Sequence, residues 1–236
     1  MRLNELSVFF PAYNEEANIA ATVEKAAGIL PKVAKKWEII VVNDGSKDKT
    51  GEIVEGLIIK IKNLRMITHS PNRGYGGALQ SGLYNSKYEW IAYTDADGQF
   101  DFSEVSKFIE KQRQTKADLI LGYYLKRQVP IYRIWGTHFW QVLVFLFFGL
   151  KVKSIDCGFK MVRKEVIEKI PKLEAERGPF IESEMLVKAK KAGFKFAEVG
   201  VYHYPRQAGA ATGASFKVIL SGFSDLVKLR NKLNAH

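Results

Sequence analysis

Short apolar segments alternate with amphipathic helical segments along most of this chain, and this alternation strongly limits the fold. The first helical segment places Ile19, Val23, Ala27 and Leu30 on one face. The segments expected to form strands are 6–10, 38–42, 64–68, 90–94, 118–122 and 196–201. Further helices are expected at 50–61, 77–87 and 103–112. The pattern predicts one α/β domain with a Rossmann-like, mostly parallel central sheet and helices on both faces.

Three polar loops directly follow predicted strands, at residues 11–16, 43–46 and 95–99. In open α/β sheets, ligands bind beyond the carboxyl ends of the strands. We therefore expect the three loops to form one ligand site at the same edge of the sheet.

The third loop reads DADGQ at residues 95–99. Its two carboxylates, from Asp95 and Asp97, can converge on one hard cation, and Gln99 can add a carbonyl oxygen. Such oxygen ligands suit Mg²⁺ or Mn²⁺, which would neutralise a diphosphate leaving group. The alternative for an isolated motif of this kind is an acidic turn in contact with solvent.

The positive charge is concentrated in the second half of the chain. The formal net charge is +11, and segments 123–163 and 201–236 carry +6 and +4 of it. Such a concentration predicts a polyanionic partner, which can be nucleic acid, anionic lipid or a phosphorylated substrate. Because no recognised nucleic-acid-binding module accompanies the charge, we expect no nucleic acid among the partners.

An apolar run at residues 139–150 interrupts the alternation. It is too short to span a bilayer, which requires about 20 apolar residues. Trp135 and Trp140, with basic residues on both flanks, favour a helix lying in a membrane interface, and a buried core helix is the alternative. A last amphipathic helix is expected at about 216–233, where it could dock on the core, bind another subunit or touch lipid.

The cellular location follows from two weaker features. Cys157 is the only cysteine, which excludes an internal disulfide and fits a reducing compartment. The first residues do not resemble a signal peptide. We therefore expect a cytoplasmic protein, in peripheral contact with the cytoplasmic face of a membrane.

Four separated motifs carry a family resemblance: PAYNEE at 11–16, VVNDGSKDKT at 41–50, NRGYGGAL at 72–79 and DADGQF at 95–100. In this order and spacing they resemble the family 2 glycosyltransferases, which have the GT-A fold. The resemblance implies inverting transfer of a hexose from a UDP- or GDP-sugar. It implies a nucleotide pocket lined by Pro11, Tyr13, Glu15 and Asp44. It further implies that Asp95 and Asp97 hold the metal and the diphosphate, with Gln99 assisting.

The second half is similar to one branch of that family, the polyprenyl-phosphate sugar transferases that include dolichyl-phosphate mannose synthase. The similarity is carried by residues 126–127, 133–150, 156–160, 203–206 and 213–215. It implies a lipid phosphate acceptor and divides the chain into a nucleotide-sugar half, 1–122, and an acceptor half, 123–236.

A lipid phosphate is already nucleophilic at neutral pH, so it needs cations to bring it to the donor rather than a strong base. Arg127, Arg133 and Arg206, together with Ser215, are the candidates to bind the acceptor phosphate. Asp156 is a second catalytic candidate beside Asp97. It could orient an arginine or stabilise positive charge at the anomeric carbon.

Two other functions stay open at this point. A family 2 enzyme could transfer to a saccharide hydroxyl in polysaccharide or glycan synthesis, with Glu182 or Glu184 as the base. A nucleic-acid-binding module could use the basic half instead. The base and sugar of the donor also stay open, as does a partner in the form of a second copy of the chain or a membrane protein.

Overall fold

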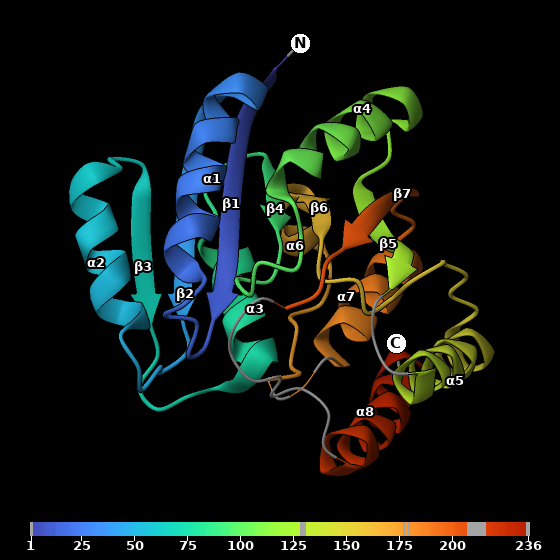
Figure 1. The fold of residues 1–236 in the computed structure, drawn as a ribbon. Coiled ribbons are helices and arrows are strands. Elements are labelled where there is room, and N and C mark those ends of the chain that lie inside the picture. Colours follow the sequence, from blue (N-terminus) through green and yellow to red (C-terminus); the bar gives the residue numbers. More distant parts are fainter. Residues whose placement is uncertain (1, 128–130, 177, 179, 207–215, 235–236) are drawn as a thin grey trace.

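The computed structural model describes residues 2–127, 131–176, 178, 180–206 and 216–234 (Figure 1). Its strands are β1 (Leu3–Ala12), β2 (Ala34–Asn43), β3 (Leu64–Thr68), β4 (Trp90–Tyr93), β5 (Leu119–Arg127), β6 (Lys160–Arg163) and β7 (Phe196–His203). Its helices are α1 (Ile19–Val33), α2 (Thr50–Lys60), α3 (Gly74–Asn85), η1 (Phe102–Glu104), α4 (Val105–Thr115), α5 (Ile131–Phe148), α6 (Lys164–Lys169), α7 (Phe180–Lys191) and α8 (Phe216–Asn234).

The seven strands form one sheet in the order β3-β2-β1-β4-β6-β5-β7. All neighbouring strands are parallel except β6, which runs antiparallel to both β4 and β5. Each of the six predicted strands is present. The predicted mixed α/β fold with a mostly parallel sheet is therefore confirmed.

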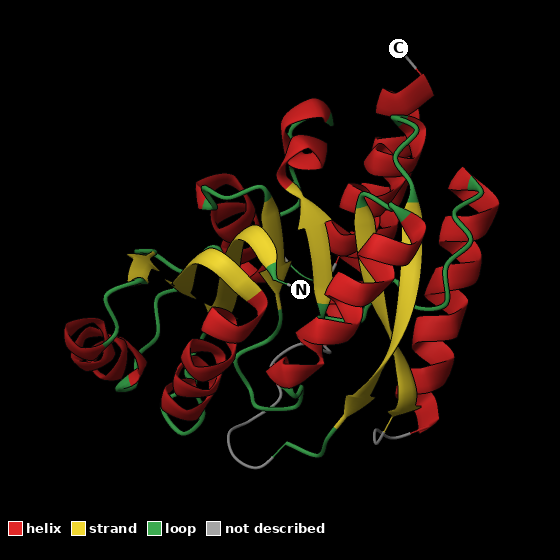
Figure 2. Cartoon of the chain, turned by 90° about the horizontal axis from the view of Figure 1, so that it is seen from above, coloured by secondary structure: helices red, strands yellow, loops and turns green. Residues whose placement is uncertain are grey.

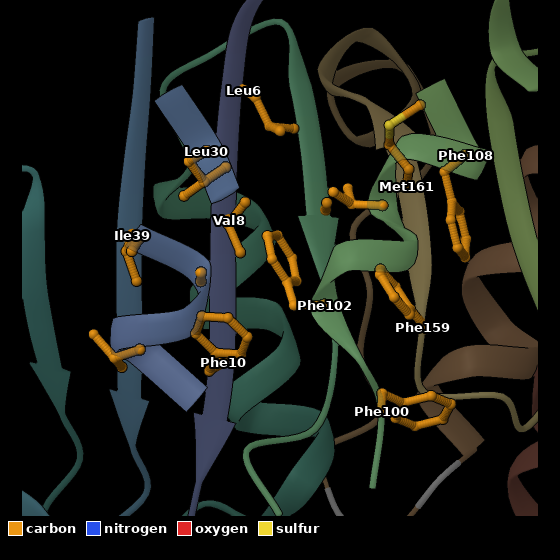
Figure 3. Close-up of a cluster of buried hydrophobic side chains, with 14 of the residues drawn as sticks. Leu6, Val8, Phe10, Leu30, Ile39, Phe100, Phe102, Phe108, Phe159 and Met161 are labelled. Atoms are coloured by element: carbon orange, nitrogen blue, oxygen red, sulfur yellow. The ribbon is translucent and has the colours of Figure 1, made fainter. Parts of the chain in front are cut away.

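Helices cover both faces of the sheet, as Figure 2 shows from above. Successive strand residues point to opposite faces, so Val8 and Phe10 of β1 pack in one hydrophobic cluster and Phe9 packs in the other. The first cluster includes side chains of α1, α2 and α4, and Figure 3 shows part of it. The second includes side chains of α3, α6 and α7. The two faces of the sheet are therefore packed against different sets of helices.

Strand β6 is the element that the sequence pattern missed. It has only four residues, and its pattern lies inside the basic segment 123–163, where no strand was expected. Strand β5 extends across the expected division between residues 122 and 123, and the sheet is continuous there. The two expected halves therefore share one sheet, and their division by substrate stays a prediction.

The apolar run at 139–150 lies mostly in α5, which is a surface helix. One side of α5 is held by Trp140, whose indole nitrogen donates to Ser183 Oγ of α7 at 2.9 Å, and by the buried Val144. The other side exposes Trp135, Phe139 and Leu146, with exposed fractions of 71%, 64% and 67%. The alternative of a buried core helix is therefore wrong for this chain.

Helix α8 lies beside α5 at the same end of the molecule (Figure 1). Lys190 and Lys191 of α7 donate to backbone carbonyls at the carboxyl-terminal ends of α5 and α8, respectively. Within the described segments, no helix combines the length and apolar character that crossing a bilayer would require.

Candidate functional site

The three polar loops meet at the carboxyl ends of β1, β2 and β4, as the sequence predicted. Hydrogen bonds join the first two loops, because Asn14 N donates to Ser46 Oγ at 3.0 Å and Glu15 N donates to Thr50 Oγ1 at 2.8 Å. Arg206, which follows β7, joins the first loop to the third. Its Nη2 lies 3.3 Å from Glu15 Oε1 and 3.0 Å from Asp97 Oδ2.

Pro11 and Tyr13 lie where the first loop leaves the sheet. Pro11 is buried and paired with Val42 of β2, and Tyr13 is half-buried. Glu15 is also buried, which raises the pKa of its carboxyl despite hydrogen bonds from Asn18 and Arg206. These three residues line the same edge, although their contact with a nucleotide stays a prediction.

The carboxylate of Asp44 is turned toward the start of α3. Oδ1 lies 2.6 Å from His69 Nδ1 and accepts from Arg73 N at 2.9 Å, while Oδ2 accepts from Gly74 N at 2.8 Å. The other ring nitrogen of His69 lies 2.8 Å from Ser81 Oγ. Asp44 therefore shapes the turn that starts α3, a role that the sequence pattern did not indicate.

Asp95 is a buried carboxylate, and the neighbouring cation Lys160 is paired with Glu182. The Oδ1 atom of Asp95 is buried and has no hydrogen-bond partner. Burial, together with the nearby carboxylates of Asp97 and Glu182, raises the pKa of Asp95 to about 7, although Tyr75 and Lys160 oppose the shift. A buried carboxylate with one unbonded oxygen and two acidic neighbours fits a site that binds a cation.

Asp97 is already bonded on both oxygens. Oδ1 accepts from Gln99 N at 3.0 Å, and Oδ2 pairs with Arg206. The side-chain amide nitrogen of Gln99 donates to Tyr204 O at 2.9 Å. In the described part of the chain, no group of three or more His, Cys, Asp or Glu side chains gathers as a ready-made metal cage. A metal here would thus be bound by Asp95 and Asp97 with a substrate diphosphate, as Mg²⁺ commonly is.

The expected acceptor-phosphate residues are only partly described. Arg206 lies at the acidic loops, where it pairs with Glu15 and Asp97. Arg127 ends β5 and Arg133 lies in the first turn of α5, but their side chains lie outside the described part of the structure. Ser215 lies outside the described residues altogether.

Asp156 ties α5 to the turn that precedes β6. Its Oδ2 accepts from Thr137 Oγ1 of α5 at 3.0 Å, and its Oδ1 accepts from Ser154 Oγ at 2.9 Å. Tyr124 OH donates to the Asp156 carbonyl at 3.1 Å. The structure thus gives Asp156 a role in placing α5, and its catalytic role stays a prediction.

Both glutamates considered as a catalytic base are buried and bonded. Glu182 Oε2 lies 2.9 Å from Lys160 Nζ and accepts from Tyr93 OH at 2.9 Å. Glu184 accepts from the backbone nitrogens of Glu174 and Ala175 and pairs with Lys188. Neither carboxylate is presented as a base to a hydroxyl acceptor.

The sequence matches one protein family, described as Glycosyl transferase family 2, over residues 7–171. This chain belongs to glycosyl transferase family 2. The matched region begins in β1 and ends just after α6, so it contains all three polar loops. The family resemblance of the four motifs is thereby confirmed, and the assignment favours a glycosyltransferase over a nucleic-acid-binding module.

Two curated relatives act on polyprenyl-type phosphates according to their names. A dolichyl-phosphate beta-glucosyltransferase of Dictyostelium discoideum is 31% identical over 220 residues, covering 83% of this chain and 65% of that protein. A dodecaprenyl-phosphate galacturonate synthase of Rhizobium johnstonii is 27% identical over 243 residues, covering 97% of this chain and 68% of that protein. The chain spans slightly less than two thirds of the Dictyostelium protein.

Solved structures confirm the GT-A fold. Glucosyl-3-phosphoglycerate synthase from Mycobacterium tuberculosis, in complex with Mn²⁺ and UDP-glucose, superposes with a TM-score of 0.67 at 17% identity. The superposition covers 98% of this chain and 77% of that one. At this identity the likeness concerns the fold alone.

Proposed function

We propose that this glycosyltransferase moves a hexose from a nucleoside diphosphate sugar, with UDP-glucose as the first candidate, to a polyprenyl or dolichyl phosphate. The names of the two curated relatives support this class of acceptor. The structural observation that carries the proposal is the bonding of Glu182 and Glu184. A sugar hydroxyl needs a base, whereas a phosphate oxygen does not.

In this reaction, an oxygen of the acceptor phosphate attacks the anomeric carbon from the face opposite the nucleotide. A new carbon–oxygen bond forms to the acceptor as the bond to the donor diphosphate breaks, and the electron pair leaves with the nucleotide. The configuration at the anomeric carbon is inverted, and no proton has to move. The contribution of the chain is to hold two phosphate groups of like charge in line.

A divalent cation, Mg²⁺ or Mn²⁺, would neutralise the leaving diphosphate when bound at Asp95 and Asp97. Arg206 already lies between the first and third loops, where the acceptor phosphate would be a further anion for its guanidinium to bind. Arg127, Arg133 and Arg206, with Ser215, are proposed to bind the acceptor phosphate. Pro11, Tyr13, Glu15 and Asp44 are proposed to form the nucleotide side of the site, and Gln99 to support the metal loop.

We also propose that the exposed side of α5 lies in the cytoplasmic surface of a membrane. Trp135, Phe139, Val142 and Leu146 recur at helical spacing on that side, and all are exposed. The exposed Lys151 and Lys153 follow α5, and Lys228, Arg230 and Lys232 lie on the neighbouring α8. Apolar side chains flanked by cations suit an interface of anionic lipid. A lipid-linked acceptor would then be presented beside the site.

The test is a panel of donors and acceptors. The chain is incubated with Mn²⁺, with radiolabelled UDP-glucose or GDP-mannose, and with polyprenyl phosphate in vesicles or a soluble oligosaccharide. Lipid-linked sugar that survives base but is released by mild acid is the expected product. Transfer only to the oligosaccharide would establish the saccharide-acceptor alternative and overturn the proposed acceptor.

A further inference from the structure

His69, which directly follows β3, lies at the centre of a buried chain of three polar side chains. Its Nδ1 lies 2.6 Å from Asp44 Oδ1, and its Nε2 lies 2.8 Å from Ser81 Oγ of α3. The side chains of His69 and Asp44 are 7% and 5% exposed. The proposed reaction uses neither His69 nor Ser81, so the burial of these two residues requires an explanation of its own.

The backbone fixes the positions of His69 and Asp44 relative to each other. His69 N donates to Asn43 O at 2.9 Å, which extends the pairing of β3 with β2. Asn72 Nδ2 donates to Asp44 O at 2.6 Å. A Cβ atom added to Gly45 would lie 3.1 Å from Asn72 N and 3.2 Å from His69 O, so the turn after β2 packs closely against the segment after β3. The sheet and these turns therefore hold the carboxylate beside the imidazole ring.

The carboxylate of Asp44 determines which nitrogen of the His69 ring carries a proton. An ionised carboxylate only accepts hydrogen bonds, so Nδ1 is the donor in the contact with Oδ1. In the neutral ring, Nε2 is then the acceptor, and the Ser81 hydroxyl donates to it. The chain from Ser81 through His69 to Asp44 thus selects one tautomer and one orientation of the ring.

Hydrogen bonds occupy most of the acceptor positions of the Asp44 carboxylate. Oδ1 accepts from His69 Nδ1 and Arg73 N, and Oδ2 accepts from Gly74 N. The two oxygens of a carboxylate offer about four such positions. Among the described residues, no second donor contacts Oδ2, so one acceptor position on this oxygen is left for a donor group of a ligand.

We propose that His69 is a positioning residue for Asp44, with Ser81 holding the imidazole ring in the tautomer that donates to the carboxylate. His69 fixes Oδ1, so that the remaining position on Oδ2 is presented to an N–H or O–H group of the nucleotide. This role explains why a histidine and a serine are buried next to the loop at 43–46. The inference rests on the nucleotide contact of Asp44 within the proposed function, and not on the metal or the acceptor.

The first experiment compares two amide variants of His69. The side-chain nitrogen of asparagine can take the place of Nδ1, whereas that of glutamine reaches the place of Nε2, on the side of Ser81. Calorimetry measures the binding of UDP and of GDP, with and without Mg²⁺ and without an acceptor. A misplaced carboxylate loses its charged hydrogen bond to the nucleotide, so His69→Gln should raise the nucleotide Kd about tenfold or more. His69→Asn should stay within about threefold of the wild type, because it keeps a donor to Asp44.

The second measurement concerns the His69 ring itself. The chain has four histidines, so isotope-labelled ring signals can be assigned by comparison with His69→Asn. Long-range proton–nitrogen correlation spectra in mildly alkaline solution should show a proton on Nδ1 of His69. A role of His69 in packing alone would not require this position of the proton.

Ser81→Ala tests the far end of the chain, because it removes the hydroxyl that faces Nε2. A neutral hydrogen bond commonly contributes about threefold or more to an equilibrium constant, so the nucleotide Kd should rise by about that factor. The matched control is Ser86→Ala, the same chemical change just after α3, where the hydroxyl donates to Gly82 O at 2.7 Å. This control should lose stability to urea yet bind the nucleotide like the wild type. A Ser81→Ala chain that binds like the control would overturn the role of Ser81.

The outcomes separate this inference from the proposed function. A folded His69→Gln chain that binds the nucleotide like the wild type overturns the positioning role and leaves the proposed function standing. A His69 ring protonated on Nε2 alone overturns the positioning role as well. Equal weakening in His69→Asn and His69→Gln would show a general effect on the turn and would also overturn it. A wild-type chain that binds neither UDP nor GDP overturns the proposed donor, and the inference with it.

Discussion

Arg206 Nη2 lies 3.0 Å from Asp97 Oδ2, so a guanidinium occupies one oxygen of the loop that is proposed to bind the metal. The same nitrogen lies 3.3 Å from Glu15 Oε1. In the absence of a metal, this arginine is the cation that balances two acidic loops. We therefore expect the partners of Arg206 to change when a metal and a diphosphate bind.

Arg206→Gln should destabilise the metal-free chain, because Glu15 and Asp97 lose their shared cation. With the arginine side chain 22% exposed, we expect a loss of about 1–2 kcal/mol, below the value for a fully buried pair. Urea unfolding with and without Mn²⁺ and UDP measures it, and the metal should restore part of the loss. Arg163→Gln, which removes a more exposed arginine in several ion pairs, is the control and should not respond to Mn²⁺.

Metal binding should depend on pH through Asp95, whose pKa is raised to about 7 by burial and by the charges of Asp97 and Glu182. Because the metal needs the ionised carboxylate, Mn²⁺ affinity should fall about tenfold per pH unit below pH 7 and level off above it. Calorimetry between pH 5.5 and 8 would measure this fall. A flat profile between pH 5.5 and 7 would contradict the prediction.

The raised pKa of Asp95 also determines how the stability of the metal-free chain changes with pH. A carboxyl whose pKa is higher in the folded chain than in the unfolded chain favours folding when it is protonated. The stabilisation is complete below the unfolded pKa and is lost as the pH rises through about 7. Asp95→Asn should remove this part of the pH dependence of the urea midpoint.

Gly158→Ala should weaken Mn²⁺ binding, because the new methyl group would collide with the Asp95 carboxylate. We expect an effect of about tenfold or more, as for the loss of an orienting partner. Gly28→Ala in α1 is the matched control, since nothing lies within 4 Å of its added Cβ. That variant should bind Mn²⁺ normally and gain helix stability of up to about 1 kcal/mol.

Phe139→Asp should reduce binding of the chain to vesicles of anionic lipid. Burial of a phenylalanine side chain contributes about 1.5–3 kcal/mol, so its loss should reduce the bound fraction about tenfold or more in flotation assays. Ile59→Asp is the control, because Ile59 is an 86% exposed apolar residue on α2, away from α5. Equal flotation of the wild type and both variants would remove α5 from the proposed membrane surface.

The central strands β1, β2 and β4 were predictable because each contains a continuous run of buried residues that are mostly apolar. Val8, Phe10 and Ile39 show this pattern directly in the sequence. The antiparallel β6 was missed because Lys160 and Arg163 bound a run of only two apolar residues. A lysine at a fully buried position gives no sign of burial until its partner on a distant helix is known.

The sequence alone determined the fold class, the family motifs and the gathering of the three polar loops, because strand periodicity and the carboxyl ends of parallel strands are local properties. Only the tertiary structure decided what those loops contact. Arg206 reaches Asp97 across 109 positions, and Glu182 pairs with Lys160 of a distant strand. Such pairings depend on the register of β4 with β6 and on the packing of α7, and the energy of a buried charge depends on its neighbours in space.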